Sequence, residues 1–582
     1  MITPLLTNPD SRRGAATNPD TQGIPATEPS RPPVGDLATV VDRLLAEQWE
    51  LTAVERFAQL VEEAAPPLQA RYYRSLLPST PPGPDEQYAF EVDLDRCSGC
   101  KACVTACHNL NGLDDNETWR DVGLLHGVRT VSGGTNPLPL LQHVTTACHH
   151  CVEPGCLAAC PTVAYEKDPS TGIVRHLDDQ CFGCQYCTLA CPYGVPKYHA
   201  EKGIVRKYDL CSNRLRAGEA PACVQACPHE AIRVRVVSRG EAIARAAEGV
   251  FLPASPAPHH TTPTTVYKSS RLDLSAARAA DEQTLEPDHA HPPLVLMLVL
   301  TQFAVGLFLV DAILSTAGVG IDGRGLSLWG RLAAFAAANV GLACATLHLG
   351  RPWLAFRAVL GWRTSWLSRE AVVFGLFVKL AVLQLAVEWL VPGWWTPLLG
   401  VATATAGLGG VWCSVMIYAI CPRPMWSLPA TAARFFATTV ALGCAGTNAA
   451  FALPLLPPTR WALGTNAALN LCLLGAGLIL AWRLVGDGRL AAASAASPEW
   501  KLRAKRLLIG PLRTMFAARM LLCPIGYGLL AAGCLLAAQG SAGVGGWLVA
   551  TGLILRVTGE LCERWLFFAA STTPRMPGGV TA

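Results

Sequence analysis

Fifteen of the 23 cysteines in this chain lie before residue 292, in four groups whose spacing restricts how this half of the chain can fold. The first and third groups read C-x2-C-x2-C-x3-C, the second reads C-x2-C-x4-C-x3-C, and proline follows the last cysteine of groups two to four. The groups are Cys97, Cys100, Cys103 and Cys107; Cys148, Cys151, Cys156 and Cys160; Cys181, Cys184, Cys187 and Cys191; and Cys211, Cys223 and Cys227. Thiols this close together can bind the same metal centre, so we expect this region to fold around metal centres.

Iron-sulfur clusters are the centres that this spacing predicts. Three thiolates from one tight loop can reach three irons of a cubane, and the cysteine before the proline can bind the neighbouring cluster. A structural zinc site needs two cysteine pairs and has no use for the third cysteine or the proline. Disulfides are disfavoured because the cysteines are clustered and no apolar leader follows Arg12-Arg13, and the C-x-x-C-H run of c-type haem does not occur.

The segments around the cysteines alternate between apolar and polar residues, which predicts short strands. They are YAFEVDL at 88–94, GIVRHL at 172–177 and AIRVRVV at 231–237, and KDPSTG at 167–172 predicts a turn. Residues 89–237 therefore predict an α+β, ferredoxin-like module made of two paired bis-cluster units.

The four motifs resemble the four-cluster iron-sulfur subunit of molybdoenzymes of the dimethyl sulfoxide reductase and polysulfide reductase type. They are CSGCKACVTAC, CHHCVEPGCLAACP, CFGCQYCTLACPYGVPKY and CSNRLRAGEAPACVQACP. The resemblance implies that group one pairs with group four and group two with group three. It implies three [4Fe-4S] ligand sets: a first of Cys97, Cys100, Cys103 and Cys227; a second of Cys148, Cys151, Cys156 and Cys191; and a third of Cys160, Cys181, Cys184 and Cys187.

The fourth set implied by the resemblance lacks one thiol. It holds Cys107, Cys211 and Cys223, and Tyr208 stands where the family has a fourth cysteine. Three thiolates suit a [3Fe-4S] cluster, which we expect here, with a potential that differs from the others and is higher. The alternatives are a [4Fe-4S] cluster completed by an oxygen of Tyr208 or water, and a site without a cluster.

The second half of the chain predicts an all-α membrane domain over residues 293–572. Eight apolar stretches are long enough to span a bilayer: 293–315, 328–348, 371–391, 397–420, 432–453, 461–482, 516–538 and 545–570. The loops after spans two, four and six carry most of the arginines and lysines, whereas the opposite loops offer little beyond Arg324 and Arg460. The positive-inside rule then predicts a multi-pass protein of the inner, cytoplasmic membrane with the iron-sulfur module on the cytoplasmic side.

This half also resembles a known family, the membrane anchor of dimethyl sulfoxide reductase and its polysulfide reductase relative. The motifs are LHLGRPWLAFRAVLGWRTSWLSRE at 347–370, SVMIYAICPRPMW at 414–426 and ERWLFFAASTTPRMPGG at 563–579. The chain thus looks like a fusion of two subunits that are usually separate. In the familiar dimethyl sulfoxide reductase the iron-sulfur subunit lies outside the cytoplasm, so the inward orientation weakens any transfer of its substrate.

Histidines are scarce in the membrane half, which restricts its cofactors. Only His348 follows His291, so two imidazoles cannot bind a haem b and we expect no haem. The remaining redox partner is a quinone or quinol, whose head group His348 and Arg351 could bind on the cytoplasmic side. Arg369 and Glu370, at the start of the third span, are further candidates. The plain alternatives are a packed interfacial histidine and ordinary positive-inside anchoring.

A few charged residues fall inside the predicted spans. Arg556 and Glu560 lie four residues apart on one helix face, and isolated charges at this depth are unfavourable, so we expect an ion pair. Either a structural pair or a proton path explains them, and the same holds for Lys379. Asp311, Lys379, Glu388 and Glu560 are too sparse to establish a proton pump.

The remaining segments are less informative. We expect residues 1–35 to be disordered, 36–88 to be a helical extension, 238–292 to be a linker and 573–582 to be a cytoplasmic tail. Asp36 is a possible helix cap, and Thr52 with Glu55 matches a capping box.

Together these patterns predict an electron-transfer and membrane-anchor subunit. It would connect the membrane quinone pool with a separate catalytic molybdopterin subunit, for example a cytoplasmic nitrate reductase or sulfite dehydrogenase, and it has no substrate site of its own. We expect no nucleic-acid partner. A subunit of a hydrogenase or of a proton-translocating respiratory complex, and a membrane iron-sulfur redox sensor, are the alternatives.

Overall fold

The computed structural model describes residues 52, 54, 55, 58, 70–115, 117–129, 138–269, 277–391, 393–452, 464–571 and 575–578. The chain divides into two compact units, Met1–Leu68 and Gln69–Ala582. In the first unit, the Thr52 N–H donates to the Glu55 carboxylate (2.7 Å) and the Glu55 N–H donates to Thr52 Oγ1 (3.2 Å). These two bonds confirm the capping box. Asp36 and the segment predicted to be disordered lie outside the described residues.

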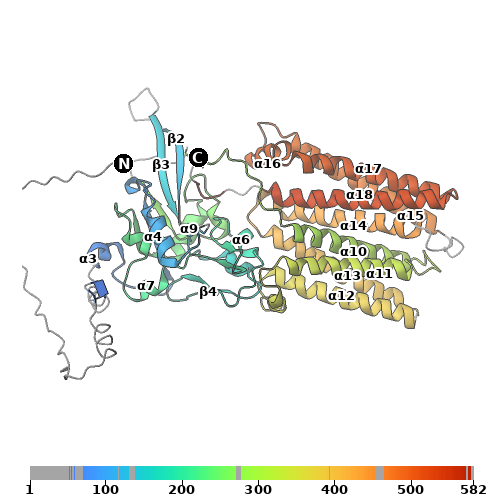
Figure 1. The fold of residues 1–582 in the computed structure, drawn as a ribbon, viewed down its shortest axis with the longest axis horizontal. Coiled ribbons are helices and arrows are strands. Elements are labelled where there is room, and N and C mark those ends of the chain that lie inside the picture. The colour runs from blue at the N-terminus through green and yellow to red at the C-terminus, as the bar shows by residue number, and fades with distance from the viewer. Residues whose placement is uncertain are drawn as a thin grey trace, which may run out of the picture. The chain divides into compact units, whose positions relative to one another are not determined.

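The second unit opens with a short helical stretch, α3 (Ala70–Tyr73) and the 3-10 helix η1 (Arg74–Leu76), and continues into two small sheets. β1 (Glu86–Asp93) pairs antiparallel with β8 (Ile232–Ser238) and parallel with β9 (Val266–Lys268). β2 (Asp121–Arg129) pairs antiparallel with β3 (Leu138–Thr146) in a long hairpin that projects from the domain in Figure 1. Two ribbons complete the set: β4 (Tyr165–Lys167) with β5 (Val174–His176), and β6 (Lys197–His199) with β7 (Ile204–Arg206). The three predicted strands are confirmed as β1, β5 and β8, and the predicted turn joins β4 to β5.

Short helices begin inside or beside each cysteine motif. They are α4 (Ala102–Asn111), α5 (Gly155–Ala159), α6 (Tyr186–Ala190), α7 (Ser212–Arg216) and α8 (Ala222–Gln225). Lys101, Gln185 and Cys211, which precede α4, α6 and α7, have φ angles of 61°, 60° and 49°. This left-handed conformation is unfavourable for residues other than glycine, so the surrounding structure must hold it. It turns the chain sharply within each motif, so that the cysteines before and after the turn face the same space.

Residues 238–292 differ from the linker that we expected. They form α9 (Arg239–Ala247), the 3-10 helix η3 (Pro258–His260), β9 in the first sheet and β10 (Arg278–Ala279), which pairs with β2. The expected C-terminal tail also makes contacts, because the Leu124 N–H donates to the Gly578 carbonyl (3.1 Å). Strands of two or three residues carry too little periodic pattern to be recognised in a sequence, which explains the difference.

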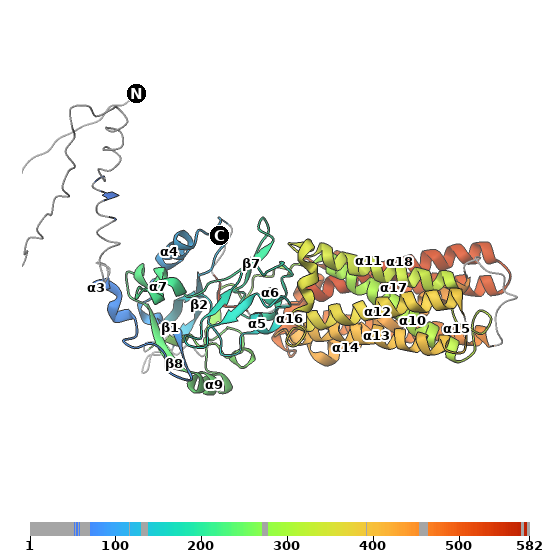
Figure 2. The same cartoon turned by 90° about the horizontal axis from the view of Figure 1, so that it is seen from below.

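The predicted all-α membrane domain is confirmed. Among the described residues, eight helices are long and apolar enough to cross a membrane. They are α10 (Pro292–Thr316), α11 (Leu328–Leu347), α12 (Trp366–Leu390), α13 (Thr396–Ala419), α14 (Leu428–Ala452), α15 (Thr465–Ala491), α17 (Arg513–Ala538) and α18 (Ala542–Ala569). They run side by side in both views of the molecule (Figures 1 and 2). Three shorter helices lie between them: η4 (Pro352–Val359), η5 (Pro424–Trp426) and the amphipathic α16 (Glu499–Ile509).

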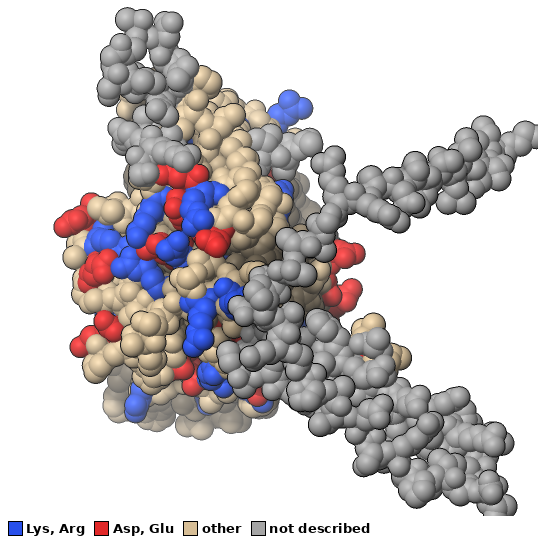
Figure 3. All heavy atoms as spheres, turned by 90° about the vertical axis from the view of Figure 1, so that its left-hand side faces the viewer, with Lys and Arg blue, Asp and Glu red and all other residues tan. Residues whose placement is uncertain are grey.

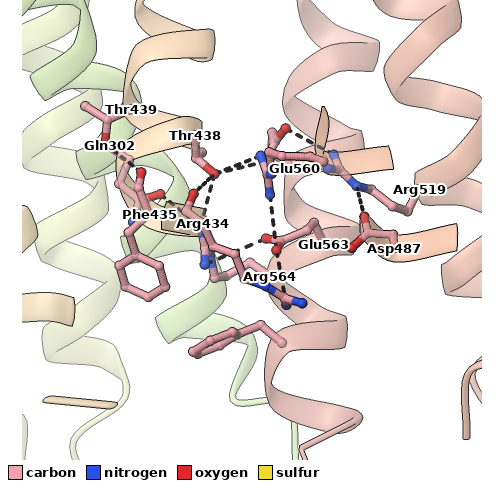
Figure 4. A network of polar contacts seen from close by, with 12 residues as sticks. Gln302, Arg434, Phe435, Thr438, Thr439, Asp487, Arg519, Glu560, Glu563 and Arg564 are labelled. Carbon is pink, nitrogen blue, oxygen red and sulfur yellow. Dashed lines mark hydrogen bonds and ion pairs between the residues drawn. The ribbon is translucent and has the colours of Figure 1, made fainter. Parts of the chain in front are cut away.

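Buried charges join four of these helices (Figure 4). The expected Arg556–Glu560 pair is present at 2.8 Å, and Glu560 also binds Arg483 (2.5 Å) and Arg519 (3.0 Å). Glu563 lies 3.1 Å from Arg483, so α14, α15, α17 and α18 share one network that further includes Arg434, Asp487 and Arg564. Paired in this way, charges can be buried in a membrane bundle.

A second buried cluster joins α10, α11 and α12. Arg331 binds Asp311 (2.7 Å) and Glu388 (2.6 Å), and the Gln384 amide donates to Asp311 (3.2 Å). Lys379, by contrast, is exposed on α12.

Candidate functional site

Twelve of the cysteines form three sets of four, and each set lines a cavity of its own. The cavities are lined by Cys97, Cys100, Cys103 and Cys227; by Cys148, Cys151, Cys156 and Cys191; and by Cys160, Cys181, Cys184 and Cys187. These are the three sets that the family resemblance implies, and in each set one cysteine comes from a different group than the other three. Because each set takes one cysteine from a second group, group one is paired with group four, and group two with group three.

The surroundings of these sulfurs suit thiolates bound to a metal. Backbone N–H groups donate to Cys160 Sγ (from Ala164, 3.2 Å), to Cys181 Sγ (from Gly183, 3.4 Å) and to Cys227 Sγ (from Ala231, 3.3 Å). Such donors favour the charged form of sulfur. Burial acts in the opposite direction and raises the pKa of the Cys191 thiol to about 11. A metal that takes up the thiolate charge resolves this conflict, so these sets of residues fit iron-sulfur clusters.

The fourth set is built around Tyr208, which is fully buried. Its hydroxyl lies 3.7 Å from Cys211 Sγ and 3.6 Å from Cys223 Sγ, and its ring stacks on Phe90 at a centroid distance of 6.0 Å. Burial and then the thiols of Cys223 and Cys211 raise the pKa of Tyr208 well above its usual value. Cys107 completes the set, and burial raises the pKa of its thiol to about 12. The phenol therefore stands at the fourth position as a neutral group that can donate a hydrogen bond to sulfur.

The loop between α11 and α12 lies directly against the third set. The Arg351 N–H donates to the Phe182 carbonyl (3.0 Å), and the Gly361 N–H donates to the Pro161 carbonyl (2.7 Å). Ser365 Oγ donates to the Ala159 carbonyl (2.6 Å). These carbonyls belong to the residues that flank Cys160 and Cys181, so the loop that joins two membrane helices is bound to the backbone that positions the third set.

His348, the C-terminal cap of α11, lies beside this set. Burial, followed by the charge of His289, lowers the pKa of His348 to about 4, and the nearby Cys184 backbone acts in the opposite direction. Its ring centroid is 5.0 Å from that of His291. His348 Nε2 and His291 Nδ1 are both buried without a hydrogen-bond partner among the described residues. The sequence did not single out His291 for this site because 57 positions of chain separate it from His348.

The other three residues predicted for the quinone site, Arg351, Arg369 and Glu370, differ in their burial and in their hydrogen-bond partners. The Arg351 side chain donates to the carbonyls of Lys202 (3.2 Å) and Asp178 (3.1 Å), so it is used for docking. The Arg369 side chain donates to the carbonyls of Trp362 (3.1 Å) and Arg363 (2.8 Å) and is half-buried. Glu370 is buried and accepts a hydrogen bond from Ser414. Among the four predicted residues, His348 and Glu370 keep buried polar groups at this junction.

Tyr186 provides a second bridge between the two halves. It lies in the third cysteine motif, is buried, and its hydroxyl donates to the Ile417 carbonyl near the end of α13 (3.0 Å). Tyr186 therefore links the third cysteine motif to α13, a role that a tyrosine inside a cysteine motif does not reveal in the sequence.

Comparison with known families agrees with this division. Residues 140–237 match the family described as 4Fe-4S dicluster domain, and residues 288–569 match the family described as DMSO reductase anchor subunit.

Several curated proteins are similar to the iron-sulfur half. The probable anaerobic dimethyl sulfoxide reductase chain YnfG of Escherichia coli (strain K12) is 34% identical over 186 residues, which are 31% of this chain and 88% of that protein. The thiosulfate reductase electron transfer subunit PhsB of Salmonella typhi is 36% identical over 148 residues, 25% of this chain and 74% of that protein. The hydrogenase-2 operon protein HybA of Escherichia coli O157:H7 is 37% identical over 160 residues, 24% of this chain and 49% of that protein.

These matches and the geometry lead to one assignment. The ferredoxin-like domain is of the cluster-binding type, its cysteines converge in sets, and the helical domain is of the anchor type. The chain belongs to the dimethyl sulfoxide reductase family of iron-sulfur electron-transfer subunits, and it carries the membrane anchor of that family fused to the same polypeptide.

Proposed function

We propose that this chain carries electrons between the membrane quinone pool and a separate catalytic molybdopterin subunit on the cytoplasmic side of the inner membrane. The observation that carries this proposal is the docking of the α11–α12 loop on the third cysteine set beside His348. It joins a residue suited to bind a quinone head group to the backbone of a cluster site, with no other domain between them.

The cluster content that we propose follows the cysteine sets. The first three sets hold [4Fe-4S] clusters, and Cys107, Cys211 and Cys223 hold a [3Fe-4S] cluster. The position of the Tyr208 hydroxyl, 3.6 to 3.7 Å from two sulfurs, supports a hydrogen-bond donor to the cluster sulfur rather than a ligand to iron. When bound, these clusters supply one-electron steps over a wide range of potentials.

At the membrane junction, His348 and His291 present ring nitrogens that have no partner in the described part of the chain and could hydrogen-bond a quinone oxygen. A neutral imidazole can accept the proton that a quinol must release on oxidation. Glu370 is a buried carboxyl group through which that proton could pass further. We therefore place His348, with His291 and Glu370, at the quinone site, and we assign Arg351 and Arg369 to docking and anchoring.

The charge of the loops supports the cytoplasmic orientation. The α11–α12 loop, the α13–α14 loop and α16 contain Arg351, Arg357, Arg363, Arg423, Lys501, Arg503, Lys505 and Arg506. They lie on the same side of the bundle as the iron-sulfur domain, whose backbone Arg351 and Arg357 contact. A reporter that is active only outside the cytoplasm should be active when inserted at residue 322 and silent when fused after residue 582. The opposite pattern would overturn the orientation.

The catalytic partner would meet the part of the iron-sulfur domain that is remote from the membrane helices. In the first set, Cys100 is exposed, so electrons can leave the chain there. The end of the domain seen in Figure 3 carries basic and acidic side chains intermixed, which suits a polar protein surface. A nitrate reductase, or a sulfite dehydrogenase with electrons flowing to quinone, fits this arrangement.

A hydrogenase subunit is the second candidate, and the similarity to HybA favours it. Its partner would contain nickel, whereas the partner in our proposal contains molybdenum or tungsten bound to a pterin. Metal analysis of the complex purified through this chain distinguishes the two.

The decisive test uses the purified chain in liposomes that contain a reduced quinol. Freeze-quenched EPR then follows the reduction of the clusters. We expect His348→Gln to slow quinol-driven reduction at least tenfold, with the iron content unchanged. The matched control is His259→Gln, at an exposed position in η3. An unchanged rate in His348→Gln would show that the quinone site lies elsewhere.

A further inference from the structure

Arg120 is a buried cation in the iron-sulfur domain that the proposed electron path does not explain. It lies immediately before β2 and is 2% exposed. Its Nη1 donates to Thr145 Oγ1 (3.0 Å), and its guanidinium carbon lies 4.6 Å from the centre of the Phe90 ring. Its Nε and Nη2 have no hydrogen-bond partner within the described part of the chain. A charge buried in this way is strongly unfavourable unless a countercharge lies close by.

The countercharge available to Arg120 comes from sulfur. No described carboxylate forms an ion pair with it, whereas Thr145, which accepts its hydrogen bond, lies 3.5 Å from Cys103 Sγ. Burial lowers the pKa of Arg120, but Cys223, Tyr208, Cys103 and Cys107 together raise it above its usual value. The Phe90 ring that the guanidinium contacts also stacks on Tyr208, whose hydroxyl lies 3.6 Å from Cys223 Sγ. The guanidinium therefore lies near sulfurs and near the phenol that stands in for a fourth sulfur.

These sulfurs belong to two different sets. Cys103 is part of the first set, whereas Cys107 and Cys223 are part of the fourth. The geometry therefore places one fixed positive charge between the two sets. Lys207 is a second buried cation of this domain, but it lines the cavity of the second set and donates to the carbonyls of Val174 and Tyr208.

We propose that Arg120 is a positioning residue for charge: its guanidinium stabilises the reduced state of the cluster at Cys107, Cys211 and Cys223, and more weakly that of the first-set cluster. The inference rests on the proposed function, because it requires clusters at both sets. Reduction adds one electron to a cluster, converts one ferric iron to ferrous iron and makes the cluster more negative. A nearby cation in a poorly solvated interior favours that state and raises the reduction potential.

The two Arg120 nitrogens that lack a partner among the described residues explain why this role suits arginine. The guanidinium keeps its charge at every accessible pH. Its N–H donors spread in a plane, so Nη1 can donate to Thr145 while the other N–H groups donate to a different acceptor. Hydrogen bonds to cluster sulfurs are among the determinants of the potential. Arg120 can therefore act through its charge and through a hydrogen bond, and a lysine would keep only the charge.

EPR-monitored redox titration of the full-length protein tests the proposal with three variants. In Arg120→Gln, the fourth-set signal, identified by its change in Tyr208→Cys, should titrate at a lower potential. We expect at least a tenfold fall in the equilibrium constant for reduction, which is about 59 mV for one electron. Arg120→Lys should show less than half of this shift. Arg235→Gln should show none, because Arg235 pairs with Glu91 (3.2 Å) on the first sheet.

An unshifted potential in Arg120→Gln with the full iron content would overturn the proposal. If Arg120→Gln loses its iron, Arg120→Lys decides the question. If Arg120→Lys keeps its clusters and they titrate near the wild-type potential, the charge role is supported. If both variants lose iron, Arg120 is needed for the shape of the site, and the proposal is overturned. The titration uses chemical reductants, so it stays informative if quinol fails to reduce the clusters, an outcome that would refute the proposed function alone.

Discussion

Gly350, in the loop after α11, lies so close to Gly203 of the iron-sulfur domain that a Cβ on Gly350 would be 2.3 Å from the Gly203 carbonyl oxygen. Gly203 itself has a φ of 63°, and a Cβ there would meet the Gly350 carbonyl oxygen at 2.4 Å. Only glycine allows two backbones to approach this closely. This contact brings the membrane loop against the third cysteine set and places His348 beside Cys184.

Substitution of Gly350 by alanine should separate the two surfaces. Neither backbone can give way cheaply, so we expect quinol-driven reduction of the clusters to fall at least tenfold in Gly350→Ala. Iron content and reduction by dithionite should stay normal, because the three atoms nearest to the new methyl group all belong to the Gly203 backbone and none to a cysteine ligand. Gly488→Ala is the control, since a Cβ at that position of α15 would meet nothing within 4 Å. A normal quinol-driven rate in Gly350→Ala would contradict the docking argument.

Replacement of Tyr208 by cysteine should restore a fourth thiolate. The wild-type protein should contain about fifteen irons per chain and show the oxidised-state EPR signal of a three-iron centre, whereas Tyr208→Cys should contain about sixteen and lose that signal. Tyr208→Phe removes the contacts to Cys211 and Cys223 but adds no ligand, so its three-iron signal should persist. A wild-type protein that is EPR-silent when oxidised and binds sixteen irons would show that an oxygen ligand completes a fourth cubane.

Removal of the Glu560 charge should destabilise the membrane domain. Glutamine at this position would leave Arg483, Arg519 and Arg556 with one fewer buried carboxylate, and breaking a buried ion pair from one side costs about 3–5 kcal/mol. We expect a clear fall in the thermal midpoint of the protein in detergent. The control is Glu499→Gln, because this side chain is 66% exposed and lies 3.8 Å from Arg503. Equal midpoints for the two variants would rule out a stabilising role for the network.

His291 should make the contact between the two domains sensitive to acid. It is 6% exposed, and burial, followed by the charge of His348, lowers its pKa to about 3. An unfolded histidine has a pKa of about 6.5, so between these values the unfolded state binds a proton that the folded state does not. Stability is therefore constant above about pH 6.5 and falls by up to about 1.4 kcal/mol per pH unit below it.

Thermal midpoints at pH 7 and pH 5 measure this effect. The difference between the two should be smaller in His291→Gln than in the wild type, whereas His259→Gln, in an exposed turn, should leave it unchanged. If His291→Gln keeps the whole pH dependence, other groups are responsible for it.

The sequence by itself determined the features that depend on short stretches of chain. Eight spans could be recognised because a bilayer demands about 20 apolar residues in each, and the structure confirms all eight. The cysteine spacing predicted cluster sites for the same reason, since one loop supplies most of the thiols at each. The capping box and three strands were likewise local patterns.

Only the tertiary structure decided the features that join distant segments. Arg434, Arg483 and Arg519 lie on three helices, and their shared carboxylates appear only once those helices pack together. β9 and β10 are too short to carry a pattern, and their partners are far away in the chain. Arg120 is an ordinary arginine in the sequence, and His291 and His348 meet across a whole helical hairpin. Burial, which makes each of these groups chemically unusual, is a property of the assembled fold.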